Sequence, residues 1–141
     1  KTAKGLPKRT PIVIHVDGDL FAPASKGPGW KPNYLGYQVA AVQALAVRGD
    51  HSSHPARTAA ERFASALRAQ GIPARLGRNA DAAADAKVLA RATGHTVAES
   101  VAVMLSESES NVAEVLYRQV ALATGHKATW AGGQRAARRF I

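Results

Sequence analysis

The sequence contains no cysteine, and this absence excludes several kinds of chemistry at once. Disulfide bonds, zinc sites with thiolate ligands and cysteine nucleophiles all require a thiol. The compartment stays open on this ground, because a protein outside the cytoplasm need not contain disulfides.

Aromatic residues are few, and long hydrophobic runs are missing. Aromatics make up 6% of the 141 residues, whereas hydrophobic residues make up 46%, with alanine supplying much of that share. A core of small side chains indicates a helix-rich chain, and the length suffices for one domain with a real core. No apolar run approaches the roughly 18 residues of a membrane-spanning helix, so no membrane span is expected in this chain.

Acidic residues are in the minority, with ten against nineteen basic residues and a formal net charge of +9. Such a charge attracts anionic partners such as nucleic acid, an acidic membrane face or an anionic wall polymer. The basic residues are scattered, however, and no helix carries a continuous basic stripe interleaved with aromatics. The pattern favours solubility or general attraction, and no nucleic-acid partner is expected. The alternative is a basic helical module that contacts phosphates through charge alone.

The chain begins at Lys1 without an initiator methionine or signal segment, and it stops at Ile141 inside an expected helix. We therefore interpret residues 1–141 as a single domain that is a piece of a larger protein.

The first half predicts one strand, one long loop and one helix. β-Branched residues over Thr10–Asp17 predict a strand, and the glycines and prolines of Phe21–Tyr34 predict an irregular loop held by Trp30 and Tyr34. The segment Tyr37–Val47 suits a helix or a strand. A helix is predicted from Pro55 to Gly71. Its core face is expected to hold Ala56, Ala60, Phe63 and Leu67.

The second half predicts further helices after an unclear stretch. Residues 74–92 suggest a strand, a turn of helix and a short strand around Val88–Ala90. Thr96 and Glu99 form a capping box for a helix that ends near Leu105, and a last helix begins near Thr129 or Ala131 and continues to Ile141. Between them a helix over 110–123 is expected, with its core side at Val112, Leu116, Val120 and Ala123.

Most of the chemically active side chains lack a supporting pattern. The five histidines carry no nucleophile-elbow or metalloprotease context, and His51 and His54 lack a carboxylate at matching spacing, so they fit ordinary loop residues better than a metal site. Asp17-Gly18-Asp19 fits a turn better than a calcium loop, because Phe21 stands where an oxygen donor is needed. Gly27-Pro28-Gly29 and Gly132-Gly133 are interpreted as turn elements. No metal or cofactor is expected.

A cluster rich in serine and glutamate, residues 104–118, is the strongest candidate for function. Ser106 to Glu109 fits a Ser-x-x-Glu cap at a helix start, which is the structural interpretation. The same arrangement is typical of the second active-site motif of penicillin-recognising serine enzymes, Ser-x-Asn, on a turn entering a helix.

The cluster resembles the low-molecular-mass class C penicillin-binding proteins, the D-alanyl-D-alanine carboxypeptidase/endopeptidase family. In that family a helix ends in Met-Leu, a Ser-Asp-Asn-type motif follows, and Ala-Glu lies on the next helix. The matching residues here are Met104-Leu105, Ser108-Glu109-Ser110 and Ala113-Glu114, followed by Arg118, Gly125 and Gly132-Gly133. A looser match covers Asp17-Gly18-Asp19-Leu20-Phe21, Gly29-Trp30, the segment 37–47 and the helix from Pro55.

The resemblance implies a serine-type peptidase of bacterial peptidoglycan that forms an acyl-enzyme and is inhibited by β-lactams, located outside the cytoplasm or at the cell wall. Ser108 would relay a proton, and Ser110 would stand at the family's asparagine position, with Asn111 as the alternative after a local shift. The Ser-x-x-Lys and Lys-Thr-Gly motifs are absent from this sequence, so the isolated chain is expected to be inactive. An inactive structural relative is the third interpretation.

The resemblance also implies the fold and the partners. The fold class is α/β in the mixed α+β sense, with helices packed on an antiparallel sheet as in penicillin-recognising serine peptidases. Unpaired strand edges would then require the remainder of the parent protein or self-association. The other expected partners, through the complete protein, are the peptidoglycan stem peptide and β-lactams.

Overall fold

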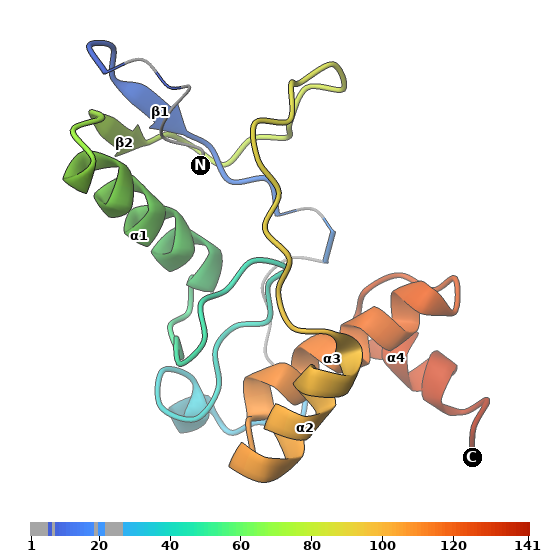
Figure 1. Cartoon of the computed structure of the whole chain (residues 1–141). Helices are drawn as coiled ribbons and strands as arrows, with labels where there is room; N and C mark the ends of the chain where they lie inside the picture. The colour runs from blue at the N-terminus through green and yellow to red at the C-terminus, as the bar shows by residue number, and fades with distance from the viewer. Residues whose placement is uncertain (1–5, 7, 19, 22–26) are drawn as a thin grey trace.

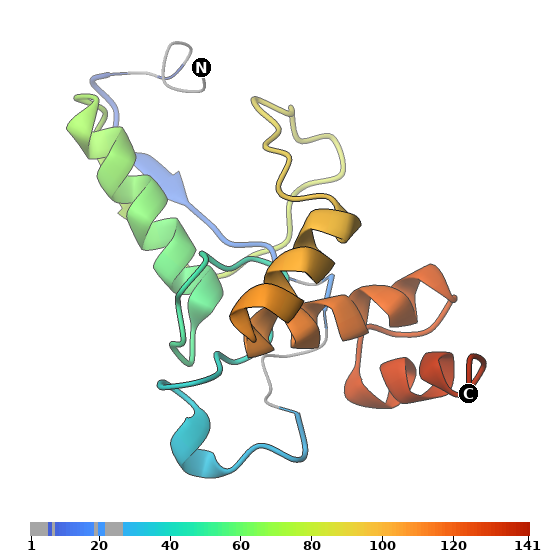
Figure 2. The same ribbon diagram turned by 60° about the horizontal axis from the view of Figure 1, so that its bottom comes forward.

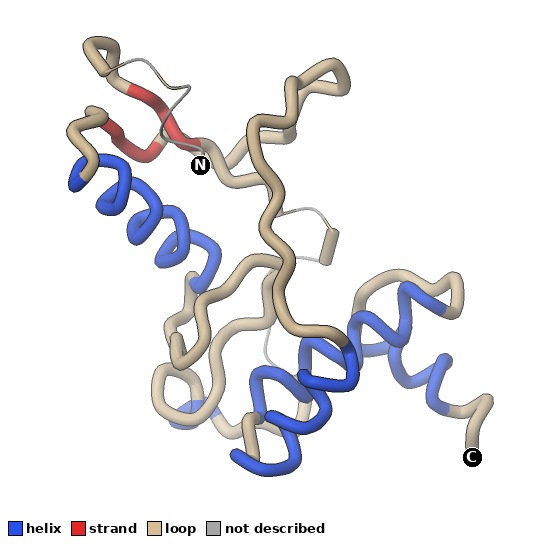
Figure 3. The backbone as a smooth tube through the Cα atoms, in the orientation of Figure 1, coloured by secondary structure: helices blue, strands red, loops and turns tan. Residues whose placement is uncertain are grey.

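A computed structural model of the chain describes residues 6, 8–18, 20–21 and 27–141. Its strands and helices form two groups, which Figure 1 shows on opposite sides of a central run of loops. Two strands and the longest helix form one group, and three helices form the other; the loops, tan in Figure 3, take up much of the remaining chain. The elements are β1 (Ile12–Ile14), the 3-10 turn η2 (Pro32–Tyr34), α1 (Pro55–Ala69), β2 (Ala74–Leu76), α2 (Val97–Glu107), α3 (Ser110–Ala123) and α4 (Trp130–Ala137).

The first group is a parallel strand pair covered by a helix. Ile12 of β1 pairs with Ala74 of β2, and Ile14 pairs with Leu76. The chain returns to β2 through α1, and a crossover of this kind brings two strands together in parallel. The expectation of an antiparallel sheet is therefore wrong for the strands that the structure describes. The mixed helix-and-strand class is confirmed.

Helix α1 begins and ends where its sequence signals predict. Pro55 occupies the first helical position after His54, and Gly71, at φ 74°, follows the end of the helix. Ala56, Ala60 and Leu67 are buried as expected, but Phe63 is 44% exposed and Ala64 takes its place in the core. A small side chain fits there because α1 lies close to β2. The core of this group is Ala64, Leu67, Ile72 and Ala74.

The segment 37–47 forms neither a helix nor a strand of more than one bridge. Leu35 forms an isolated bridge with Val39, Val42 is a further isolated bridge residue, and the chain between them passes through the interior. Residues 39–42 are all buried, and the Ala41 N–H donates to the carbonyl of Ser52 at 3.2 Å. The apolar character of this segment thus reflects a buried connection between the two groups.

The long stretch from residue 77 to residue 96 contains no strand. The predicted strand around Val88 and Leu89 does not form, and both side chains are exposed, at 60% and 63%. A turn between Ala83 and Ala86 is the one regular feature of the alanine-rich part. No neighbouring strand is available to pair with this segment within the described residues.

The second group packs α3 between α2 and α4, as the two views in Figures 1 and 2 show. The capping box of Thr96 and Glu99 forms at the start of α2, as predicted. Thr129 caps α4 through a hydrogen bond from the Gly132 N–H at 3.0 Å. Of the two predicted starting points, Thr129 and Ala131, the helix therefore starts from Thr129 as its N-cap. Helix α4 ends at Ala137, short of the predicted Ile141.

Two details of the second group differ from the sequence prediction. The buried residues of α3 are Glu114, Arg118 and Ala121, whereas Val120 and Ala123 are exposed. Gly132 and Gly133 lie inside α4 rather than in a turn. A Cβ at Gly133 would come within 2.4 Å of the Tyr117 ring, so the glycine allows α4 to approach α3 closely.

Candidate functional site

The turn between α2 and α3 carries the three candidate residues, and it forms from the local sequence. Ser108 adopts a left-handed conformation, φ 52° and ψ 40°, as the C-cap of α2, and its N–H donates to the carbonyl of Met104. Glu109 then caps α3 by accepting a hydrogen bond from the Asn111 N–H at 3.2 Å. The predicted Ser-x-x-Glu cap is therefore wrong, because Ser106 still lies within α2.

Ser108 is exposed at this turn, and its backbone is strained. It is the only residue other than glycine with a positive φ in the described part of the chain. A left-handed conformation costs a residue with a Cβ roughly 1 kcal/mol. Such strain is found at functional turns more often than elsewhere.

Ser110, the first residue of α3, lines a hollow of about 240 Å³ between the loop at Trp30 and the two last helices. We call this site the aromatic hollow. Its lining residues are Trp30, Ser110, Ala113, Glu114, Tyr117 and Trp130. The rings of Tyr117 and Trp130 lie 4.7 Å apart between their centroids.

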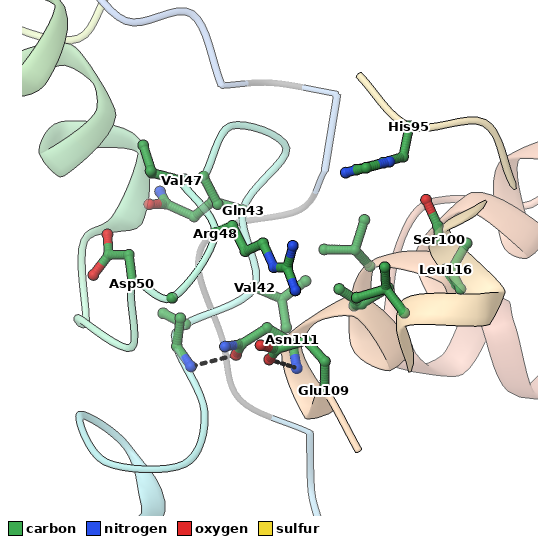
Figure 4. A pocket seen from close by; sticks show the side chains of 17 residues that line it. Val42, Gln43, Val47, Arg48, Asp50, His95, Ser100, Glu109, Asn111 and Leu116 are labelled. Atoms are coloured by element: carbon green, nitrogen blue, oxygen red, sulfur yellow. Dashed lines mark hydrogen bonds between the residues drawn. The ribbon is translucent and has the colours of Figure 1, made fainter. Parts of the chain in front are cut away.

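Asn111 faces a second hollow, of about 230 Å³, on another side of α3. Its side-chain carbonyl accepts a hydrogen bond from the buried N–H of Ala40 at 2.6 Å, as Figure 4 shows. Consecutive residues of an α-helix point about 100° apart. Ser110 and Asn111 therefore line different hollows, and the Asn111 side chain is already occupied in joining α3 to the buried residues 39–42.

The second hollow, which we call the apolar hollow, has a mostly apolar wall with polar groups at its edge. Arg48, Asp50, His95 and Asn111 are among the polar residues that line it, and Val42 and Leu116 are among the apolar ones. Figure 4 shows Arg48 extending across the space toward the α2–α3 turn.

The charges around the apolar hollow are partly compensated. Arg48 pairs with Glu107, and the hydrogen bond and negative charge of Glu107 raise the pKa of Arg48 above its ordinary value. Burial raises the pKa of Asp50, but this effect is outweighed by hydrogen bonds from Ser52 and Thr58 and by the positive charge of Arg62. The pKa of Asp50 therefore lies below its ordinary value. Both groups are therefore charged at neutral pH.

Two buried charged residues, Glu114 and Arg118, were not predicted as part of the interior. They are 6% and 3% exposed and lie one turn apart on α3. The indole N–H of Trp30 donates to Glu114 Oε1 at 2.7 Å, which confirms that Trp30 holds its loop to the body. The spacing of Glu114, Arg118 and Ala121 on one helix face was the available signal, but an apolar stripe was expected there.

The other candidate ligands lie apart from one another. His51 and His54 occupy the loop before α1, as expected for ordinary loop residues. Within the described residues, no group of three histidine, aspartate or glutamate side chains is placed to hold a metal ion. The Asp17 carboxylate accepts a hydrogen bond from the Ala82 N–H at 2.9 Å, whereas Asp19 lies outside the described residues.

No helix among the described residues is both long and apolar enough to cross a membrane.

Comparison with known proteins gives a family for the region that contains this turn. No curated protein and no solved structure matches the chain. The model of the D-Ala-D-Ala carboxypeptidase 3 (S13) family matches residues 45–141, which is more than half of the chain and includes α1 to α4. The looser likeness of residues 17–44 lies before the matched region. The match confirms the family that the cluster at 104–118 indicates, and the chain belongs to the D-Ala-D-Ala carboxypeptidase 3 (S13) family.

Proposed function

We propose that this chain is part of the catalytic domain of a serine-type D-alanyl-D-alanine carboxypeptidase or endopeptidase that acts on peptidoglycan peptides outside the bacterial cytoplasm. Family membership supports the activity and the substrate class. The single observation that carries the assignment of residues is the α2–α3 turn, which lies within the matched region and presents the exposed hydroxyl of Ser108 beside Ser110.

The reaction proceeds through an acyl-enzyme. A serine supplied by the rest of the protein, assisted by a lysine, attacks the carbonyl carbon of the penultimate D-alanine. A serine–carbon ester bond forms, the carbon–nitrogen bond breaks, and the terminal D-alanine leaves after its amine takes a proton. Water then hydrolyses the ester, which releases the shortened peptide and restores the serine. β-Lactams acylate the same serine.

In this mechanism Ser108 relays the proton between the serine–lysine pair and the leaving amine. Its exposure at the turn suits a group that must meet residues from another part of the protein. A hydroxyl both donates and accepts a hydrogen bond, so it can accept one proton while it gives up another and remains neutral.

Ser110 rather than Asn111 stands at the position that binds the substrate amide. The Asn111 carbonyl is engaged by Ala40, and a shift of register would break that bond and leave a buried N–H without a partner, at a cost of about 1–3 kcal/mol. A hydroxyl is shorter than an amide and offers a different donor set, so substrate binding at this position is weak.

The isolated chain is inactive under this proposal, because its sequence contains neither Ser-x-x-Lys nor Lys-Thr-Gly. The chain carries only the second of the three motifs, and the nucleophilic serine belongs to the absent Ser-x-x-Lys motif.

The test is intact-mass analysis after incubation with penicillin, on the complete gene product and on residues 1–141. A one-to-one adduct on the complete protein and none on residues 1–141 is the expected result. No adduct on the complete protein would contradict the proposed acyl-enzyme, and it would favour an inactive relative in the same family.

A further inference from the structure

The aromatic hollow combines groups that favour a cation. Aromatics are 6% of the chain, yet three of the six described residues that line this hollow are aromatic, Trp30, Tyr117 and Trp130. The faces of such rings attract organic cations, most strongly for tryptophan. Both tryptophans of the chain line the same hollow.

Glu114 supplies a negative charge at the same place. Its Oε1 accepts the Trp30 indole N–H and is closely covered by Gly27, where a Cβ would come within 2.5 Å. Its Oε2 is buried and has no hydrogen-bond partner. A buried carboxylate oxygen without a donor is costly, so a positive charge in the hollow beside this carboxylate would lower that cost.

We propose that the aromatic hollow binds a primary alkylammonium group, of the kind carried by an amino-acid side chain. The ammonium lies beside the Glu114 carboxylate and is held by its negative charge, and its alkyl stem lies against the rings of Tyr117 and Trp130. One carboxylate is too few for a metal ion such as Ca²⁺ or Mg²⁺, which requires several oxygen ligands. A single charge surrounded by rings suits an organic cation instead.

The charge of the whole chain makes this binding distinctive. With a formal net charge of +9, the molecule repels small cations in general. Arg118 is buried one turn further along α3 and is not among the residues that line the hollow. Saturable binding of an ammonium ion would therefore come from the local site and not from a diffuse negative surface.

The inference goes beyond the proposed peptidase function, because it concerns binding by these residues and needs no nucleophile. Ser110 shares the hollow with Glu114, so in an active parent protein the site would favour substrates with an amino group at that point. A failure of ammonium binding would leave the penicillin adduct unaffected, and the reverse also holds.

Tryptophan fluorescence measures occupancy directly, since both indoles line the hollow. We would titrate residues 1–141 with n-butylammonium chloride at neutral pH, with n-butanol as the uncharged probe of the same stem and sodium chloride as the ionic-strength control. A saturable change with n-butylammonium alone is expected, at about millimolar concentration as befits so small a ligand. An equal response to n-butanol, or no saturable response, would overturn the proposal.

Variants test whether n-butylammonium binds in the aromatic hollow. Glu114→Gln keeps the shape and an acceptor for Trp30 but removes the charge, and it should weaken n-butylammonium binding roughly tenfold. Glu61→Gln is the matched control, because Glu61 is an exposed carboxylate on α1, paired with Arg57, and its affinity should equal that of the unmodified chain. Trp130→Leu, at a residue that is 37% exposed, tests the rings if Glu114→Gln fails to fold, with Trp30 as the remaining reporter. Unchanged affinity in the folded variants would contradict the site.

Discussion

At the scale of single residues, adjacent positions of the α2–α3 turn have separate tasks. Ser108 adopts a left-handed conformation, Ser110 lines the aromatic hollow, and Asn111 joins α3 to the buried residues 39–42. The sequence predicts that these residues belong together, but it leaves the register between Ser110 and Asn111 open. That register depends on the Ala40 N–H, a contact between residues 71 positions apart, which no local pattern contains.

Ser110→Asn tests the amide-binding position in the complete protein. An asparagine there restores the longer side chain and its second donor, so the rate of acylation by penicillin should rise about two- to tenfold, the effect of one neutral hydrogen bond. The rate is measured by following the intact mass of the adduct with time. The proposal for Ser110 would be wrong if the unmodified protein were acylated no more slowly than the variant.

Ser108→Gly separates the structural role of Ser108 from its chemical role. Glycine adopts a positive φ without strain, so the substitution should raise the free energy of unfolding, by up to roughly 1 kcal/mol. The urea midpoint of residues 1–141 measures this. In the complete protein the same variant should lose penicillin acylation, because the hydroxyl is gone. A variant acylated at the original rate would remove Ser108 from the mechanism.

At the scale of elements, the sequence predicts where helices begin, whereas it does not predict which helix face is buried or how the strands pair. Pro55, Thr96 and Thr129 mark helix starts because caps are local hydrogen bonds. The buried face of α3 could not be predicted in the same way, because the indole of Trp30, distant in sequence, stabilises Glu114 there. The parallel pairing of β1 likewise depends on the path of α1 and not on the strand's own residues.

The corrected face of α1 gives a paired test of stability. Leu67→Ala removes a side chain that is 3% exposed and should cost about 2–5 kcal/mol. Phe63→Ala, at 44% exposure, removes a larger side chain and should nevertheless cost under about 1.5 kcal/mol, because it leaves little cavity. Urea unfolding followed by far-ultraviolet circular dichroism measures both. A larger loss for Phe63→Ala would contradict the described packing of α1.

The start of α2 gives a test of pH dependence. Hydrogen bonds from the Thr96 backbone and hydroxyl to the Glu99 carboxylate lower the pKa of Glu99 below its ordinary value. A lowered pKa stabilises the folded state above the ordinary value, and this contribution is lost as the pH falls through the lowered pKa. The protection factors of the amides in the first turn of α2, which correct for the pH dependence of intrinsic exchange, should therefore fall below the ordinary pKa of glutamate, and Glu99→Gln should abolish that fall. A variant that keeps the same pH profile would contradict the capping box.

At the scale of the whole molecule, the two groups of elements have separate cores. One core consists of Ala64, Leu67, Ile72 and Ala74, and the other contains Phe21, Val42 and Ala128. Separate cores open with separate free energies, so the groups should unfold in two steps. Both tryptophans lie beside the second group, and fluorescence reports that group alone. Leu67→Ala should therefore lower the urea midpoint of amide exchange in α1 while leaving the fluorescence midpoint nearly unchanged. A fluorescence midpoint that falls together with the α1 midpoint would show that the chain unfolds as one cooperative unit.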